Sequence, residues 1–214
     1  MSNLSYMQKA SDRGQLQIHV TTERGFFPIK DASIRLSYTG NPTEIIEELS
    51  TDISGQTAAV ELPAPPLEYS MEPSEFQPYS EYTIQVNASG YRPINISGIS
   101  VLPDKTSIQN VRMETATVEN PLERNIVITA NTLYGNFPPK IPEDEIKPMT
   151  ESGEIVLSRV VIPEYVIVHD GPPSDSSAND YYVRYRDYIK NVASSEIYAT
   201  WPDAALRANI LAIM

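Results

Sequence analysis

Alternation of apolar and polar residues with a period of two is the feature that most constrains the fold of this chain. The pattern recurs in four runs, at Leu16, Ile18 and Val20, at Ile34, Leu36 and Tyr38, and within residues 83–88 and 108–113. Such alternation buries one face of a β-strand and leaves the other face in water. The sequence therefore predicts a β-rich region over residues 14–113.

Turn-forming residues separate these predicted strands at short intervals. They lie in Thr39-Gly-Asn-Pro, Asp52-Ile-Ser-Gly, Ala88-Ser-Gly-Tyr and Leu102-Pro-Asp-Lys. Glycine, proline, asparagine and aspartate each favour turn conformations. Leu62-Pro-Ala-Pro-Pro is restricted to a loop or an edge strand, because proline lacks the N–H that an inner strand needs. Short strands with turns at this spacing are typical of a β-sandwich.

Prolines mark the end of the predicted sandwich. The 214 residues contain 18 prolines, above the usual share of about 5%. Those at positions 138, 139, 142 and 148 lie in a polar stretch and exclude a regular helix there. We therefore expect residues 114–152 to be a linker, with a short strand at 125–130, and an exposed linker is a natural protease target. Residues 1–13 are expected to be a flexible N-terminus.

An α+β pattern follows in residues 153–214. Two β-branched runs flank Pro163 and predict strands that are broken at a bend. Residues from Tyr185 to Ala193 have helical spacing, and a second apolar helix is predicted to begin at Pro202, since proline is tolerated in the first turn. The expected fold class is mostly β, with an α+β C-terminal part.

Composition excludes several functional classes. The formal charge of −12, from 28 acidic and 16 basic residues, argues against a nucleic-acid-binding protein, which carries clustered Lys and Arg. The chain has no cysteine and two histidines, His19 and His169, so we expect no metal and no cofactor. No apolar stretch has the length of a signal-peptide core or of a membrane helix. We therefore expect a soluble chain without a classical signal peptide and without a membrane partner.

Glu196 is the candidate catalytic residue. Small residues precede it and apolar ones follow it in the run Ala193-Ser-Ser-Glu-Ile-Tyr. A glutamate at a helix end is usually a solvated charge, but an apolar neighbourhood favours the protonated form that a general acid needs. His169 is expected to end a strand and bond locally rather than to act in catalysis. The tyrosines at 181, 182, 185 and 188 could stack on sugars, although core packing is favoured for those at helical spacing.

The run that contains Glu196 resembles the signature of SpoIID-type peptidoglycan lytic domains. That signature has the pattern Val-x-x-Ser-Glu-x-x-x-x-Trp-Pro-x-x-Ala-Leu-x-Ala. The residues that match it are Val192, Ser195, Glu196, Trp201, Pro202, Ala205, Leu206 and Ala208. The glutamate of the signature is catalytic in that family, so the resemblance implies a catalytic role for Glu196. Asp203 is better explained as a first-turn residue favoured by the helix dipole.

Nearly the whole chain resembles the N-terminal half of the SleC family of spore cortex-lytic enzymes. The supporting phrases are Thr132-Leu-Tyr-Gly-Asn-Phe-Pro-Pro-Lys-Ile-Pro-Glu, Val161-Ile-Pro-Glu-Tyr-Val-Ile-Val-His-Asp-Gly and Asp187-Tyr-Ile-Lys-Asn-Val-Ala-Ser-Ser-Glu-Ile-Tyr-Ala-Thr-Trp-Pro. The resemblance implies a germination proenzyme in the cortex or coat region of the spore. A subtilisin-like protease would remove its pro-region. The processed enzyme would then cleave the glycan strands of cortex peptidoglycan as a lytic transglycosylase.

The predicted sandwich is similar in its order of elements to carboxypeptidase-regulatory-like or transthyretin-like modules. The shared features include the turn Thr51-Asp-Ile-Ser-Gly, the proline-rich loop from Leu62 and the pair Gly90-Tyr. Such modules are mostly accessory or binding domains. An alternative function is therefore a noncatalytic sandwich that binds a partner or inhibits an enzyme.

SpoIID-type domains also use a downstream arginine, histidine and tyrosine, and SleC-type proteins carry a C-terminal peptidoglycan-binding module. By the resemblance, all of these would lie beyond Met214. We therefore expect residues 153–214 to form the first part of a truncated SpoIID-type domain. We also expect the 214-residue chain to lack lytic activity by itself, so the sequence leaves open whether this chain is an enzyme.

Overall fold

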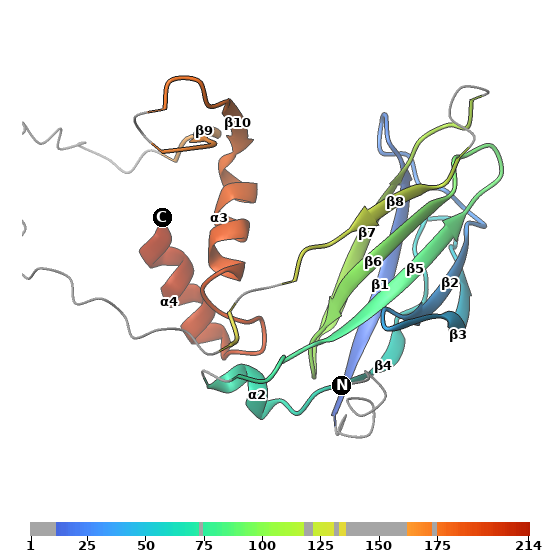
Figure 1. The fold of residues 1–214 in the computed structure, drawn as a ribbon, viewed down its shortest axis with the longest axis horizontal. Coiled ribbons are helices and arrows are strands. Elements are labelled where there is room, and N and C mark those ends of the chain that lie inside the picture. The colour runs from blue at the N-terminus through green and yellow to red at the C-terminus, as the bar shows by residue number, and fades with distance from the viewer. Residues whose placement is uncertain (1–11, 73–74, 118–121, 131–132, 136–161, 173–174) are drawn as a thin grey trace, which may run out of the picture. The chain divides into compact units, whose positions relative to one another are not determined.

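The structure is a computed structural model that describes residues 12–72, 75–117, 122–130, 133–135, 162–172 and 175–214. The chain divides into two compact units. The first comprises residues 1–135 and 198–202, and the second comprises residues 136–197 and 203–214. The described chain is mostly β-sheet with few helices, as the sequence predicts (Figure 1).

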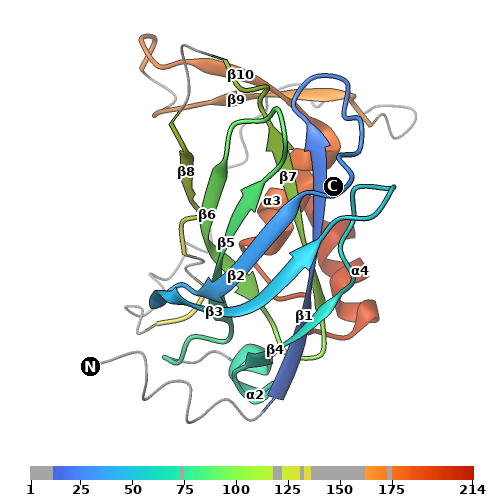
Figure 2. The same cartoon turned by 90° about the vertical axis from the view of Figure 1, so that its right-hand side faces the viewer.

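The first unit consists of two sheets (Figures 1 and 2). Its elements are β1 (Asp12–Thr22), β2 (Ser33–Tyr38), β3 (Asn41–Ser50), β4 (Val60–Ala64), α2 (Glu68–Met71), β5 (Ser80–Asn87), β6 (Ile94–Val101), β7 (Thr106–Met113) and β8 (Arg124–Val127). One sheet has the strand order β4-β1-β7 and the other the order β3-β2-β5-β6-β8. β1 pairs with β4 antiparallel and with β7 parallel, and β6 pairs with β8 parallel.

The hydrophobic core of this unit joins both sheets. Leu16, Ile18 and Val20 of β1 are fully buried, as the period-two pattern predicts. The same cluster contains Ile34, Leu36, Tyr38, Leu62, Tyr82, Ile84, Val86, Ile94, Ile96, Ile99, Val101, Val111 and Met113. The predicted strand at 108–113 is confirmed, although Ile108 is 54% exposed. The proline-containing strand β4 lies at a sheet edge, as expected for a strand with a missing N–H.

The turn that begins at Thr51 is held by side chains and lies against β1. Its Asp52 Oδ1 accepts hydrogen bonds from Ser54 N at 2.8 Å and from Gln56 N at 3.0 Å. Hydrogen bonds from the Ser54 side chain and from the Gln56 backbone lower the pKa of Asp52. Gly55 has a φ of 73°, and a Cβ there would lie 2.5 Å from the Val20 carbonyl oxygen. The close approach to β1 therefore requires glycine at this position.

The sheets extend beyond the predicted sandwich at both ends. β1 begins at Asp12 rather than Gly14, and the five-stranded sheet includes β8, which the sequence analysis placed in the linker. β8 overlaps the short strand predicted at 125–130. Its residues Arg124–Val127 pair in parallel with Ile94–Ser97 of β6.

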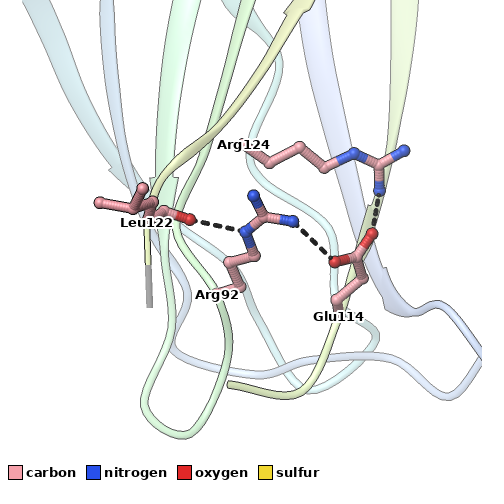
Figure 3. A network of polar contacts seen from close by, with 4 residues as sticks. All are labelled: Arg92, Glu114, Leu122 and Arg124. Atoms are coloured by element: carbon pink, nitrogen blue, oxygen red, sulfur yellow. Dashed lines mark hydrogen bonds and ion pairs between the residues drawn. The ribbon is translucent and has the colours of Figure 1, made fainter. Parts of the chain in front are cut away.

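Three charged side chains link the start of β8 to the residues that flank β6 and β7 (Figure 3). Glu114 accepts a hydrogen bond from Arg92 at 3.0 Å on Oε2 and one from Arg124 at 2.8 Å on Oε1. Arg92 Nε also donates to the Leu122 carbonyl oxygen at 2.6 Å. Glu114 and Arg92 are each 23% exposed, so their charges are only partly screened by water.

The second unit contains β9 (Tyr165–His169), β10 (Asp180–Arg184), α3 (Tyr185–Ser194) and α4 (Asp203–Ile213) within its described residues. β9 and β10 form an antiparallel pair. Both predicted helices are confirmed, and α4 begins directly after Pro202. The strand expected before Pro163 falls at residues 154–161, which lie outside the described residues. Ile189 is the buried hydrophobic residue of this unit in the described part of the chain.

Among the residues that the structure describes, no helix is both long enough and apolar enough to cross a membrane.

Replacement of Glu114 by glutamine is expected to destabilise the first unit. The change leaves two guanidinium groups without their carboxylate partner, and hydrogen bonds to charged groups contribute about 1.5–3 kcal/mol each before screening. We therefore expect Glu114→Gln to lower the free energy of unfolding by about 1–2 kcal/mol in urea denaturation. Glu48→Gln is the control, because the Arg35–Glu48 pair is 56% and 68% exposed. An equal loss in both variants would contradict a special role for Glu114.

Limited proteolysis is expected to cut first between residues 128 and 152. The sequence there is polar and interrupted by prolines, whereas β8 is paired in the sheet. Mass spectrometry should therefore find a persistent N-terminal fragment that retains Val127. A stable fragment that ends near Met113 would show that β8 is dispensable for the sandwich.

Candidate active site

Glu196 lies in the turn that follows α3. α3 ends at Ser194, and the backbone N–H of Glu196 donates to the Ala193 carbonyl oxygen at 3.1 Å. The Glu196 side chain is exposed. The end of the helix therefore places this carboxyl group at the surface, where a large substrate has access to it.

Asn209 of α4 holds one oxygen of the Glu196 carboxyl group. Asn209 Nδ2 donates to Glu196 Oε2 at 2.8 Å. In the described part of the chain no hydrogen bond is formed to Oε1, so one oxygen is fixed and the other is open to a ligand. Asn209 Oδ1 is buried and has no hydrogen-bond partner among the described residues. The amide therefore retains an acceptor next to the carboxyl group.

The sequence analysis did not single out Asn209. It lies in the run Ala208-Asn-Ile-Leu-Ala, where its amide is the one polar side chain, but nothing local in the sequence marks it as the partner of Glu196. Glu196 and Asn209 come together because the turn between the helices brings the second helix back to the end of the first. Asp203 occupies the first turn of α4, as predicted.

The serines next to Glu196 do not contact its carboxyl group. Ser194 Oγ and Ser195 Oγ each donate to the Asn191 carbonyl oxygen at 2.9 Å. Both hydroxyls therefore satisfy the C-terminal end of α3, where backbone carbonyls lack helical partners. The neighbourhood predicted for Glu196 is thus built from small residues that bond to the helix rather than to the carboxylate.

His169 ends β9 and bonds locally, as predicted. Its Nδ1 lies 2.9 Å from Asp180 Oδ1, and its Nε2 lies 3.1 Å from the Pro172 carbonyl oxygen. The hydrogen bond with Asp180 raises the pKa of His169, and the bond to Pro172 adds to this effect. Both ring nitrogens are engaged, so His169 is placed to fasten the β9–β10 pair rather than to transfer protons.

Three of the four clustered tyrosines are exposed. Tyr181, Tyr182 and Tyr188 are 50%, 76% and 37% exposed, and Tyr185 is half-buried, with its hydroxyl donating to the Met214 carbonyl oxygen at 3.2 Å. Tyr185 and Tyr188, the two at helical spacing, are therefore partly covered within the described chain. Ile189 takes the buried position next to Tyr188.

Acidic and histidine side chains do not cluster into a metal-binding group in the described residues. The candidate site therefore consists of one carboxyl group, its amide partner and the ends of two helices. A carboxyl group is a side chain of the kind that can give a proton to a ligand or take one from it.

The His169–Asp180 pair makes the second unit sensitive to pH. Because the pKa of His169 is raised on folding, the stabilising contribution is fully present below about pH 6.5 and is lost as the pH rises through the folded value. We expect the His169 ring resonance to titrate above pH 6.5 in an NMR experiment and to move down in Asp180→Asn. Asp170→Asn removes a neighbouring charge that is not paired with the ring, and should shift the titration less. Equal shifts in both variants would contradict the pairing.

No protein-family model and no curated protein matches the chain. Several solved structures match part of it. The Bacillus anthracis TIE protein is 17% identical over 49% of this chain and 17% of its own, with a TM-score of 0.34. The minor pilin GBS52 of Streptococcus agalactiae is 13% identical over 50% of this chain and 46% of its own, with a TM-score of 0.35.

A third match is the 5-hydroxyisourate hydrolase of Klebsiella pneumoniae. It is 15% identical over 49% of this chain and 92% of its own, with a TM-score of 0.32. The chain therefore spans less than half of the length of the first two matches. At these identities and scores the likenesses assign the chain to no family.

Proposed function

We propose that this chain belongs to a spore cortex-lytic proenzyme of the SleC type, with Glu196 as the catalytic acid and base of a SpoIID-type domain. The sandwich would be its pro-domain, of the carboxypeptidase-regulatory or transthyretin-like kind. The substrate is the glycan strand of cortex peptidoglycan. The observation that carries the proposal is the exposed Glu196 carboxyl group, with one oxygen held by Asn209 and the other open.

The reaction needs one carboxyl group that acts twice. Glu196 first donates its proton to the glycosidic oxygen between N-acetylmuramic acid and N-acetylglucosamine, and the bond to the muramyl C1 breaks. It then takes the proton of the muramyl C6 hydroxyl, whose oxygen bonds to C1 and closes an anhydro ring. No water is consumed, so the second carboxylate of a glycoside hydrolase is not required.

Asn209 supports this cycle as a positioning residue. A side-chain amide carries both a donor and an acceptor. Nδ2 donates to the ionised carboxylate at 2.8 Å, and rotation of the amide by half a turn would present the partnerless Oδ1 to the protonated form. The same residue therefore suits both protonation states through which Glu196 passes.

Activation by a subtilisin-like protease would take place in the segment 114–152. Its polar and proline-rich sequence suits an extended protease substrate. The strand β8 is paired in the sheet, which favours cleavage beyond Val127. We place the processed enzyme in the cortex or coat region of the spore.

A noncatalytic sandwich module is the second candidate function. It is favoured by the contrast between the two units. The first unit has a large buried core, whereas Ile189 is the buried hydrophobic residue of the second unit within the described chain. In that case the sandwich binds a partner or inhibits an enzyme, and Glu196 is a surface charge.

Replacement of Glu196 by glutamine tests the proposed chemistry. Glutamine keeps the size and the hydrogen bond to Asn209 but has no transferable proton. General acid–base groups contribute about 10²–10⁴-fold, and here one residue serves both steps. We expect Glu196→Gln to lower the release of anhydro-muropeptides from cortex peptidoglycan by about 10³-fold or more. The assay uses the longest form of the protein that the gene encodes, after processing.

Two further variants control this experiment. Glu164→Gln makes the same chemical change at the residue that precedes β9 in the sequence, and it should leave the rate unchanged. Asn209→Ala should lower kcat by about tenfold with little change in KM, because a misplaced carboxyl group is a poorer catalyst. Retention of more than about a tenth of the rate by a folded Glu196→Gln protein would rule out Glu196 as the acid.

A further inference from the structure

The loop after β1 presents two aromatic side chains at the surface of the first unit. Phe26 and Phe27 are 58% and 68% exposed. Exposed aromatic side chains next to each other lose the stabilisation that burial would give. Exposed apolar side chains that lie next to each other often mark a binding site.

Hydrogen bonds hold this loop in one conformation. Thr22 N donates to the Phe27 carbonyl oxygen at 2.9 Å, and Phe27 N donates to Thr22 Oγ1 at 3.1 Å. Thr22 Oγ1 in turn donates to the Arg24 carbonyl oxygen at 2.7 Å. The rings are therefore displayed by a loop that is already ordered, which lowers the entropy lost on binding.

Phe26 has a φ of 54°, a left-handed conformation that is strained for a bulky side chain. The guanidinium group of Arg112 on β7 lies 4.6 Å from the centre of its ring. This contact covers the ring of Phe26 from one side and keeps it in place. Backbone strain that is held by its surroundings is concentrated at functional sites.

A pocket of about 460 Å³ lies beside Phe27. It forms because β1 and β7 are parallel and Thr22 lies opposite Met113, so the segments that follow both strands leave the sheet together. Besides Phe27, the residues that line it include Glu23, Arg24, Glu114, Thr115 and Thr117. Its volume is within the range of small-molecule sites.

Glu114 is one of the residues that line this pocket. Both of its carboxylate oxygens already receive hydrogen bonds from Arg92 and Arg124 (Figure 3). Each oxygen has a further lone pair, so it can still accept a hydrogen bond from a ligand. Its charge is balanced by the two guanidinium groups, which favours an uncharged ligand.

We propose that this pocket binds one sugar ring of a glycan. A pyranose ring has a face of C–H groups that stacks on an aromatic ring, and an edge of hydroxyls that donate and accept hydrogen bonds. Phe27 provides the apolar wall, Glu23 and Glu114 provide acceptors, and the Thr115 hydroxyl provides both a donor and an acceptor. Carboxylates and a guanidinium group line the same pocket, so neither a strongly anionic nor a strongly cationic ligand is preferred. This inference goes beyond the proposed lytic function, since the pocket lies in the first unit and does not involve Glu196.

The test is titration of the full 214-residue chain with the N-acetylglucosamine tetramer, monitored by NMR and calorimetry. We expect saturable shifts of backbone amides within residues 22–27 and 113–117. Phe27→Ala should weaken binding by at least about tenfold, and Thr115→Val by about threefold, because it removes one hydroxyl with little change of shape. Phe76→Ala is the matched control, because Phe76 is also 55% exposed and stacks on Tyr69 at 4.9 Å. It should leave binding unchanged.

Phe27→Leu keeps an apolar side chain but lacks the flat ring, so it separates stacking from folding. It should stay folded and still bind weakly. No saturable shift at about 10 mM tetramer, or equal binding by wild type and both Phe27 variants, would overturn the proposal. The amide shifts report on residues 22–27 and 113–117, whereas the release of anhydro-muropeptides reports on Glu196, so the failure of the sugar site and the failure of the lytic function are separate results.

Discussion

Burial of β1 is the constraint on which the rest of the first unit depends. Leu16, Ile18 and Val20 are fully buried, and each such side chain contributes about 1.5–3 kcal/mol. A slip of one residue would turn all three to the solvent, so the register of β1 is strongly specified. The parallel pairing with β7 then places Thr22 opposite Met113. The positions of the Phe27 loop and of Glu114 follow from that register.

The strands that could be predicted are those whose burial alternates. Residues of β1, β2 and β5 show the pattern directly, and the turn at Thr51 follows from residues that bond to their own backbone. β3 could not be found in this way. Its sequence Asn-Pro-Thr-Glu-Ile-Ile-Glu-Glu-Leu-Ser places two isoleucines next to each other, and almost all of its residues are exposed. β3 forms because its backbone pairs with β2, and not because its own side chains are buried.

β8 shows a different limit of sequence reasoning. A strand of four residues, of which two are polar, has too short a pattern to assign it to the sheet rather than to a linker. Its place depends on Glu114, which binds Arg92 next to β6 and Arg124 in β8 itself. Contacts between residues that are distant in sequence leave no local trace. The hydrogen bond between Glu196 and Asn209 was missed for the same reason, because it needs the turn between α3 and α4.

The two units are stabilised by different kinds of interaction. Apolar burial dominates in the first, whereas the described second unit relies on polar contacts such as His169–Asp180, Tyr185–Met214 and Asn209–Glu196. All three hydrogen bonds are exposed to water, so each of them stabilises the fold only weakly. None of the residues of α4 is buried within the described structure, although its sequence is largely apolar. A catalytic carboxyl group must be held to within about 0.5 Å. The proposed lytic activity at Glu196 therefore requires that the apolar side chains of α4 be covered, because the single hydrogen bond from Asn209 cannot hold α4 in place.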